Sequence, residues 1–251
     1  MKLNIKNLAK TLQLKKEGKP TSEFYPSQQS CQIPNLDFLY RKFLGERDFG
    51  LFVEIGANDG VSCSNTWGLA ERGWNGFMVE PIPKFAQLCR ENHKNHPLVS
   101  IHQYAIGEQD GENLKLSVAG MLTTANPNLE AEYINTPWAR HLVTNQYMEI
   151  KSKKLDSFLA ENSIKPNFDV LVVDVEGYET NVFAGFSLNL WTPKILIVEI
   201  ADLHPDLNSV SIAAVRLGRH ILSLGYSIAF KDSINTIFVK DDTWDNAFKG
   251  S

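Results

Sequence analysis

A series of short apolar runs, separated by segments with helical spacing, constrains the fold of this chain more than any other feature. Continuous apolar runs of this kind are typical of strands that are buried on both faces of a parallel sheet. The runs cover residues 51–55, 76–80, 99–104, 170–174 and 195–199. The segments with helical spacing cover residues 65–72, 83–93, 155–162 and 210–224. The alternation predicts an α/β fold, a Rossmann-like, doubly wound and mostly parallel sheet.

Both ends of the chain depart from this alternation. Two strand-like runs, 226–230 and 236–239, are joined by a short turn and predict a terminal antiparallel hairpin. Residues 1–48 are predicted to form an N-terminal helical extension, and residues 49–251 the main domain. Within the extension we expect a lysine-rich surface helix over residues 1–19.

A second helix is expected over residues 36–44, because its apolar residues are periodic and Gly45 follows them. Between residues 112 and 150 the strand and helix pattern is interrupted. We expect an insert of short strands and loops there, near the active face. Its stretch from 121 to 147 carries side chains that can stack on a sugar ring or hydrogen-bond to it, namely Tyr133, Trp138, Arg140 and His141.

The composition excludes several classes of protein. Of the 251 residues, 43% are hydrophobic and 22% charged, which argues against a disordered chain. A formal net charge of -4 offers no general attraction to phosphate backbones, so we expect no nucleic-acid partner. The three cysteines are irregularly spaced and favour a reducing, cytoplasmic location over a disulfide framework. No apolar run approaches the roughly 20 residues that a membrane span requires, and no feature specifies an oligomeric state.

The strongest local signal is the turn that follows the first apolar run. Residues 53–60 read Val-Glu-Ile-Gly-Ala-Asn-Asp-Gly, a buried strand that leads into small residues and then a helix. Glycine lets the backbone approach a ligand closely, and ligands of open α/β sheets collect at the carboxyl ends of strands. We therefore expect Gly56, Ala57, Asn58 and Gly60 to contact a nucleotide-like cofactor; a tight turn without a ligand is the alternative.

Glu80 ends the second run and is predicted to lie at the tip of the neighbouring strand. A carboxylate there can accept hydrogen bonds from both hydroxyls of an adenosine ribose. NAD would satisfy the same geometry, but the turn at Gly56 lacks the G-x-G-x-x-G pattern that cradles a pyrophosphate. S-adenosylmethionine has no phosphate and needs no such cradle.

Three acidic residues, Asp174, Glu176 and Glu179, follow the fourth run. Such a cluster can bind the cofactor's ammonium group, hold a divalent metal or deprotonate a hydroxyl. Capping of the next helix is the structural alternative, particularly for Glu179. Glu199 and His204, after the fifth run, are also able to line the cleft.

Together these motifs resemble the FkbM-type methyltransferases. The resemblance covers roughly residues 27–240 and is carried by the motifs at 52–60, 64–66, 74–76, 79–81, 105–107, 155–156 and 174–179. It implies a class I methyltransferase fold, S-adenosylmethionine as donor and commonly O-methylation of sugars or secondary metabolites. By position it implies that Glu54, Gly56 and Gly60 form the cofactor turn and that Glu80 holds the ribose. Asp174 would lie beside the methionine end of the cofactor.

The motif 105–107 places Ala105 among the expected cofactor-binding residues. Glu54 departs from the commoner form of the family, which has Asp at this position. Among the acids, we expect Glu176 or Glu179 to position or deprotonate the acceptor, with Asp174 as a third catalytic residue. We expect metal-independent transfer, with a divalent metal as an open alternative. The acceptor is expected to be a small molecule or a glycan.

Two other functions fit parts of the sequence. An NAD- or nucleotide-sugar-dependent oxidoreductase is disfavoured by the terminal hairpin and by the missing phosphate loop. A non-catalytic binding protein on the same fold is disfavoured by the acidic cluster, although a fold alone does not determine function.

Overall fold

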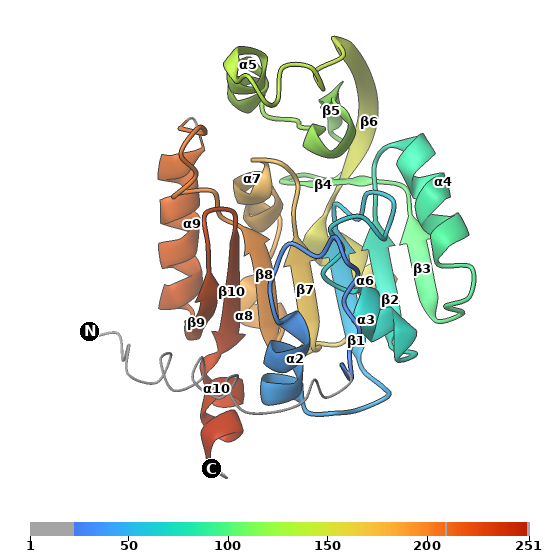
Figure 1. Cartoon of the computed structure of the whole chain (residues 1–251), viewed down its shortest axis with the longest axis vertical. Coiled ribbons are helices and arrows are strands. Elements are labelled where there is room, and N and C mark those ends of the chain that lie inside the picture. Colours follow the sequence, from blue (N-terminus) through green and yellow to red (C-terminus); the bar gives the residue numbers. More distant parts are fainter. Residues whose placement is uncertain (1–22, 209, 250–251) are drawn as a thin grey trace.

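A seven-stranded sheet forms the centre of the protein, with strand order β3-β2-β1-β7-β8-β10-β9 (Figure 1). The computed structural model describes residues 23–208 and 210–249. The strands are β1 (Leu51–Ile55), β2 (Asn75–Val79), β3 (Val99–His102), β7 (Val170–Val173), β8 (Ile195–Glu199), β9 (Tyr226–Lys231) and β10 (Asn235–Lys240). The first five pair in parallel, whereas β10 is antiparallel to both β8 and β9. The predicted fold class and terminal hairpin are confirmed.

Helices cover both faces of this sheet. Side chains of β1 alternate between the faces: Val53 and Ile55 lie in one buried cluster and Phe52 in the other. The first face carries α6 (Leu155–Glu161), α7 (Glu179–Ala184), α8 (Leu188–Trp191) and α9 (Ser211–Ser223). The second carries α2 (Leu36–Leu44), α3 (Trp67–Glu71), α4 (Pro83–Asn92) and α10 (Asp241–Phe248). None of the helices in the described part of the chain combines the length and apolar character needed to cross a bilayer.

The segment before β1 packs into the main core. Tyr25 and Tyr40 share a buried cluster with Trp74, and the ring centroids of Tyr25 and Trp74 are 5.8 Å apart. The helix expected over residues 36–44 is confirmed as α2. The helix expected over residues 1–19 lies outside the described residues, and a domain boundary at residue 48 stays a prediction.

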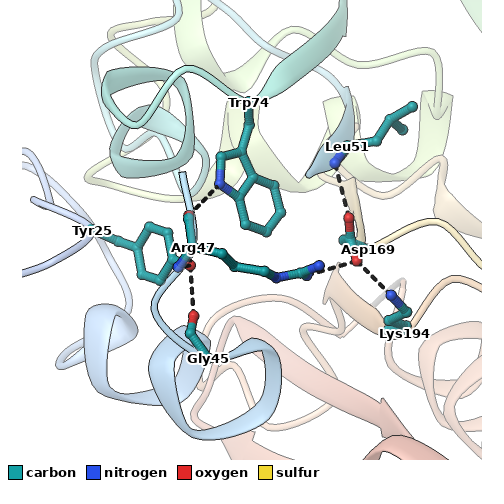
Figure 2. Close-up of polar contacts among 7 residues, drawn as sticks. All are labelled: Tyr25, Gly45, Arg47, Leu51, Trp74, Asp169 and Lys194. Atoms are coloured by element: carbon teal, nitrogen blue, oxygen red, sulfur yellow. Dashed lines mark hydrogen bonds and ion pairs between the residues drawn. The ribbon is translucent and has the colours of Figure 1, made fainter. Parts of the chain in front are cut away.

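A buried carboxylate, Asp169, joins this segment to the amino-terminal edge of the sheet. It accepts hydrogen bonds from the Leu51 amide at 2.9 Å, from Arg47 Nη2 at 2.8 Å and from Lys194 Nζ at 2.7 Å (Figure 2). The Arg47 carbonyl in turn accepts a hydrogen bond from Trp74 Nε1 at 3.0 Å. The contacts link the starts of β1, β7 and β8, at the opposite edge from the carboxyl ends of the parallel strands.

The insert and the preceding strand β4 (Ala105–Gly107) form a smaller unit above the carboxyl ends of the parallel strands (Figure 1). After β4, this unit contains β5 (Asn113–Val118), the 3-10 helix η1 (Gly120–Leu122), α5 (Pro127–Asn135) and β6 (Gln146–Lys154). The three strands form a sheet of order β4-β6-β5. The prediction of strands and loops alone was wrong about α5. Asn126 caps that helix by accepting hydrogen bonds from the Asn128 and Leu129 amides, and Pro127 occupies its first position.

Candidate active site

A cavity of about 280 Å³ lies where β1, β2, β7 and β8 end, beneath the insert. Of the site residues predicted from the sequence, it is lined by Glu54, Gly56, Ala57, Asn58, Glu80, Ala105, Asp174 and Glu176. Gly60 and Glu179 do not line it. No lysine or arginine is among its described lining residues, whereas five carboxylic acids are, the fifth being Glu199.

The turn after β1 depends on a glycine at its first position. Gly56 has φ of 90°, and a Cβ added there would lie 1.7 Å from the Asp174 carbonyl oxygen. Only glycine fits so close an approach between the ends of β1 and β7. The side-chain Oδ1 of Asn58 is buried and has no hydrogen-bond partner among the described residues.

Gly60 serves a different purpose. Its φ is 77°, and an added Cβ would lie 2.7 Å from Cys89 Sγ and from the His93 ring. The residue therefore allows the end of the turn to pack against α4, away from the cavity.

Glu80 and Glu54 are buried carboxyl groups at the ends of neighbouring strands. Glu80 is 5% exposed, and its two oxygens accept hydrogen bonds from the Asn58 amide at 2.9 Å and the Ile82 amide at 2.8 Å. Glu54 is 4% exposed and accepts a 2.6 Å hydrogen bond from Thr66 Oγ1. Burial raises the pKa of each carboxyl group to about 7.

Asp174, Glu176 and Glu199 form an acidic cluster, in which one carboxylate oxygen from each lies within 4.8 Å of the others. Burial raises the pKa of each of the three, and the neighbouring acids raise those of Glu176 and Glu199 further. The Tyr133 hydroxyl donates a 2.6 Å hydrogen bond to Glu176 Oε2. The cluster therefore joins the ends of β7 and β8 to helix α5 of the insert.

Glu179 shapes the turn that presents this cluster. It is 7% exposed, and its Oε1 accepts hydrogen bonds from the amides of Val175 at 3.0 Å and Gly177 at 3.2 Å. Glu176 has φ of 53°, and its carbonyl accepts a 2.6 Å hydrogen bond from Thr124 Oγ1. Glu179 thus accepts hydrogen bonds from the backbone of the turn that precedes α7, while Glu176 lines the cavity.

An aromatic wall lies at the insert side of the cavity. Trp138 lines it and is 41% exposed, with its ring 6.2 Å from Tyr133 and 5.9 Å from His204. Arg140 and His141, which were expected to contribute here, do not line the cavity.

Comparison with known proteins decides the family. Residues 54–228 match the family model described as the methyltransferase FkbM domain, which is more than half of the chain. The chain belongs to the FkbM methyltransferase family.

One curated relative of this FkbM protein is the 2-O-methyltransferase NoeI of Sinorhizobium fredii (strain NBRC 101917 / NGR234). It is 24% identical over 168 residues, covering 62% of this chain. The match spans 65% of NoeI, slightly less than two thirds of its length.

Solved structures with similar folds are more distant. The O-methyltransferase from Bacillus cereus in complex with S-adenosylhomocysteine (SAH) aligns with a TM-score of 0.45 and 15% identity, covering 94% of this chain and 91% of that one. The precorrin-6y C5,15-methyltransferase from Geobacter metallireducens GS-15 aligns with a TM-score of 0.43 and 10% identity, covering 84% and 90%. We draw no functional argument from likenesses of this size.

All five acids that line the cavity of this FkbM protein were predicted as candidates from the sequence, but their grouping was not. Glu199 is the last residue of the buried strand β8, and Asp174 directly follows the buried strand β7. A position at a strand end is the sequence feature that identifies Glu199 as a candidate. Tyr133, one of the insert residues predicted to be able to contact a sugar ring, is 2% exposed and hydrogen-bonded to Glu176. No spacing rule pairs residues of an insert with the end of a distant strand.

Proposed function

We propose that this FkbM-family protein is an S-adenosylmethionine-dependent methyltransferase that methylates a hydroxyl oxygen of a sugar, glycan or other small molecule. The observation that carries the proposal is the place of Glu80. Its carboxyl group lines the cavity at the tip of β2, beside the glycine turn that follows β1. Membership of a methyltransferase family supports the same reaction class.

The residues of the turn suit an adenosine-containing cofactor without a pyrophosphate. Each Glu80 oxygen accepts one backbone hydrogen bond and keeps acceptor capacity for a ribose hydroxyl. Asn58 Oδ1 is a buried acceptor that has no partner in the described part of the chain, and such an atom is costly unless a ligand supplies a donor. Gly56 lets the ends of β1 and β7 approach closely, because any side chain there would collide with the Asp174 carbonyl.

Bound S-adenosylmethionine would supply a methyl group whose bond to sulfur breaks, with its electron pair left on sulfur, as the bond to the acceptor oxygen forms. The chain has to align the acceptor and exclude water, which is the main demand of such a displacement. We assign Glu176 to hold the acceptor hydroxyl and receive its proton, with Asp174 on the cofactor side. Tyr133 fixes the orientation of Glu176.

The cavity also favours one class of acceptor. Five acids and no lysine or arginine among the described lining residues disfavour phosphate-rich acceptors such as nucleic acid. The exposed ring of Trp138 offers a face for the apolar side of a sugar ring.

The proposal is tested by incubating the protein with S-adenosylmethionine labelled in its methyl group and with fractionated glycans and metabolites of its cells. We expect label in a product that resists mild alkali, because methyl ethers survive it and methyl esters do not. Label found only on nitrogen or in an alkali-labile ester would contradict O-methylation of a hydroxyl. The Glu80→Ala variant serves as the matched control and should transfer far less label.

A further inference from the structure

The acidic cluster of Asp174, Glu176 and Glu199 brings three carboxyl groups close together. One oxygen of each lies within 4.8 Å of the others, a separation at which like charges in a partly buried site repel strongly. The described residues that line the cavity include no lysine or arginine to offset this repulsion.

Only some of the carboxyl oxygens of the cluster have hydrogen-bond partners among the described residues. Tyr133 donates to Glu176 Oε2, which leaves the other oxygen of Glu176 for a ligand. The carboxyl groups of Asp174 and Glu199 lie side by side in the cluster. The second oxygen of Glu199, Oε2, is buried and has no hydrogen-bond partner among the described residues. A buried acceptor left in this way is costly, and it is a second sign, beside the charge, that a ligand belongs here.

The turn that carries Asp174 and Glu176 is already fixed in place. Glu179 Oε1 accepts hydrogen bonds from two amides of the turn, and Thr124 Oγ1 donates to the Glu176 carbonyl. Binding at the cluster would therefore require little ordering of the backbone.

We propose that Asp174, Glu176 and Glu199 bind a hard divalent cation such as Mg²⁺ or Mn²⁺. Carboxylate oxygens are the ligands these ions prefer, and three of them from two strand ends leave further positions for water or an acceptor hydroxyl. The metal-independent transfer expected from the sequence stays a prediction that the structure does not test. The third acid that the structure brings to this cluster is Glu199 and not Glu179.

The role of the ion in methyl transfer rests on the proposed function, whereas its binding does not. When bound, the ion would favour ionisation of an acceptor hydroxyl coordinated to it. Glu176 would then act by holding the ion, with Tyr133 as a positioning residue.

The test is a titration of the EDTA-treated full chain with Mn²⁺, in which electron paramagnetic resonance reports the free ion. We expect one Mn²⁺ per chain, displaced by Mg²⁺. Glu199→Gln and Asp174→Asn should each weaken binding at least about 10-fold, and Tyr133→Phe, which removes only a supporting hydrogen bond, by about 10- to 100-fold. Thermal melting identifies which variants are folded.

Glu80→Gln is the matched control, since it neutralises another buried acid of the same cavity outside the cluster. It should bind Mn²⁺ like the wild type and SAH more weakly. Absence of Mn²⁺ binding, or binding that folded Glu199→Gln and Asp174→Asn both retain, overturns the cation site and leaves Glu176 to act directly on the hydroxyl. Mn²⁺ binding without any SAH binding would instead contradict the proposed methyltransferase while the cation site stands.

Discussion

The hydroxyl of Tyr133 donates a 2.6 Å hydrogen bond to Glu176 Oε2, which ties helix α5 of the insert to the end of strand β7. We predict that Glu176→Gln lowers kcat by about 100-fold or more, since a positioned acid-base group contributes at least that much. Tyr133→Phe should lower kcat by about 10-fold or more, because the hydrogen bond that orients Glu176 is lost. Steady-state kinetics on the identified acceptor measures both, and affinity for SAH should survive. Full activity of both variants would exclude this role for Glu176.

The contacts of Glu179 predict an effect on stability and not on the reaction. Glu179→Ala removes the acceptor for the Val175 and Gly177 amides, so the free energy of unfolding should fall by about 1 to 3 kcal/mol. Urea denaturation measures the loss, and SAH titration of the folded protein should give an affinity close to that of the wild type. An unchanged stability with a kcat reduced 100-fold would contradict this prediction and indicate that Glu179 takes part in the reaction.

The buried carboxylate of Asp169 predicts a second effect on stability. Lys194 and Arg47 hydrogen-bond to it and hold its pKa below the usual value, in opposition to burial, which raises it. Asp169→Asn should therefore cost about 1 to 3 kcal/mol at pH 7. Asp48→Asn is the matched control: it removes the exposed ion pair with Arg72 and should cost less than about 1 kcal/mol. Equal losses of unfolding free energy in the two variants would show that the buried contacts of Asp169 stabilise the fold no more than an exposed ion pair does.

Much of the fold follows from the sequence because few arrangements can bury both faces of a continuous apolar strand. Runs such as 170–174 can be buried on both faces only in a covered parallel sheet, and β7 lies at the centre of one. The position of β10 between β8 and β9 was not predicted, since a hairpin can add to a sheet by either strand. Helix α5 was not predicted because the Asn126-Pro127 pair that begins it is equally typical of a turn.

The site was predictable to the extent that it lies at strand ends. Glu80 and Asp174 reach the cavity because parallel strands end at one edge of the sheet. Glu176 and Glu179 lie only three positions apart and follow the same strand. Their different contacts go with the positive φ of Glu176, which no pattern of residue types specifies. Distances across the cluster arise from packing between segments that are far apart in the chain.

The raised pKa of Glu54 predicts a pH-dependent difference in stability. Its carboxyl group has a pKa of about 7 in the folded protein, against an ordinary value of 4.5. Protonation of Glu54 thus stabilises the fold fully below pH 4.5, and this contribution is lost as the pH rises through 7. Glu54→Gln stays neutral and can still accept from Thr66, so its Tm relative to wild type should rise between pH 5 and pH 8.

Differential scanning calorimetry of the two proteins side by side measures this difference. Burial lowers the pKa of His93 and of His102, so these residues make the protein more stable as the pH rises. Both proteins contain them, and their contribution cancels in the difference between the two Tm values. A Tm difference that stays constant over this pH range would show that Glu54 is not protonated near neutrality.

The most direct test of the account is calorimetric titration of the protein with SAH, with NADH as the competing ligand, in the wild type and in Glu80→Ala. We predict that SAH binds the wild type with a dissociation constant between low micromolar and submillimolar and that NADH binds more weakly or not at all. Glu80→Ala should weaken SAH binding by about 1 to 3 kcal/mol, because a buried acceptor for the ribose hydroxyls is lost. Tighter binding of NADH than of SAH, or an unchanged SAH affinity in folded Glu80→Ala, would contradict the central claim.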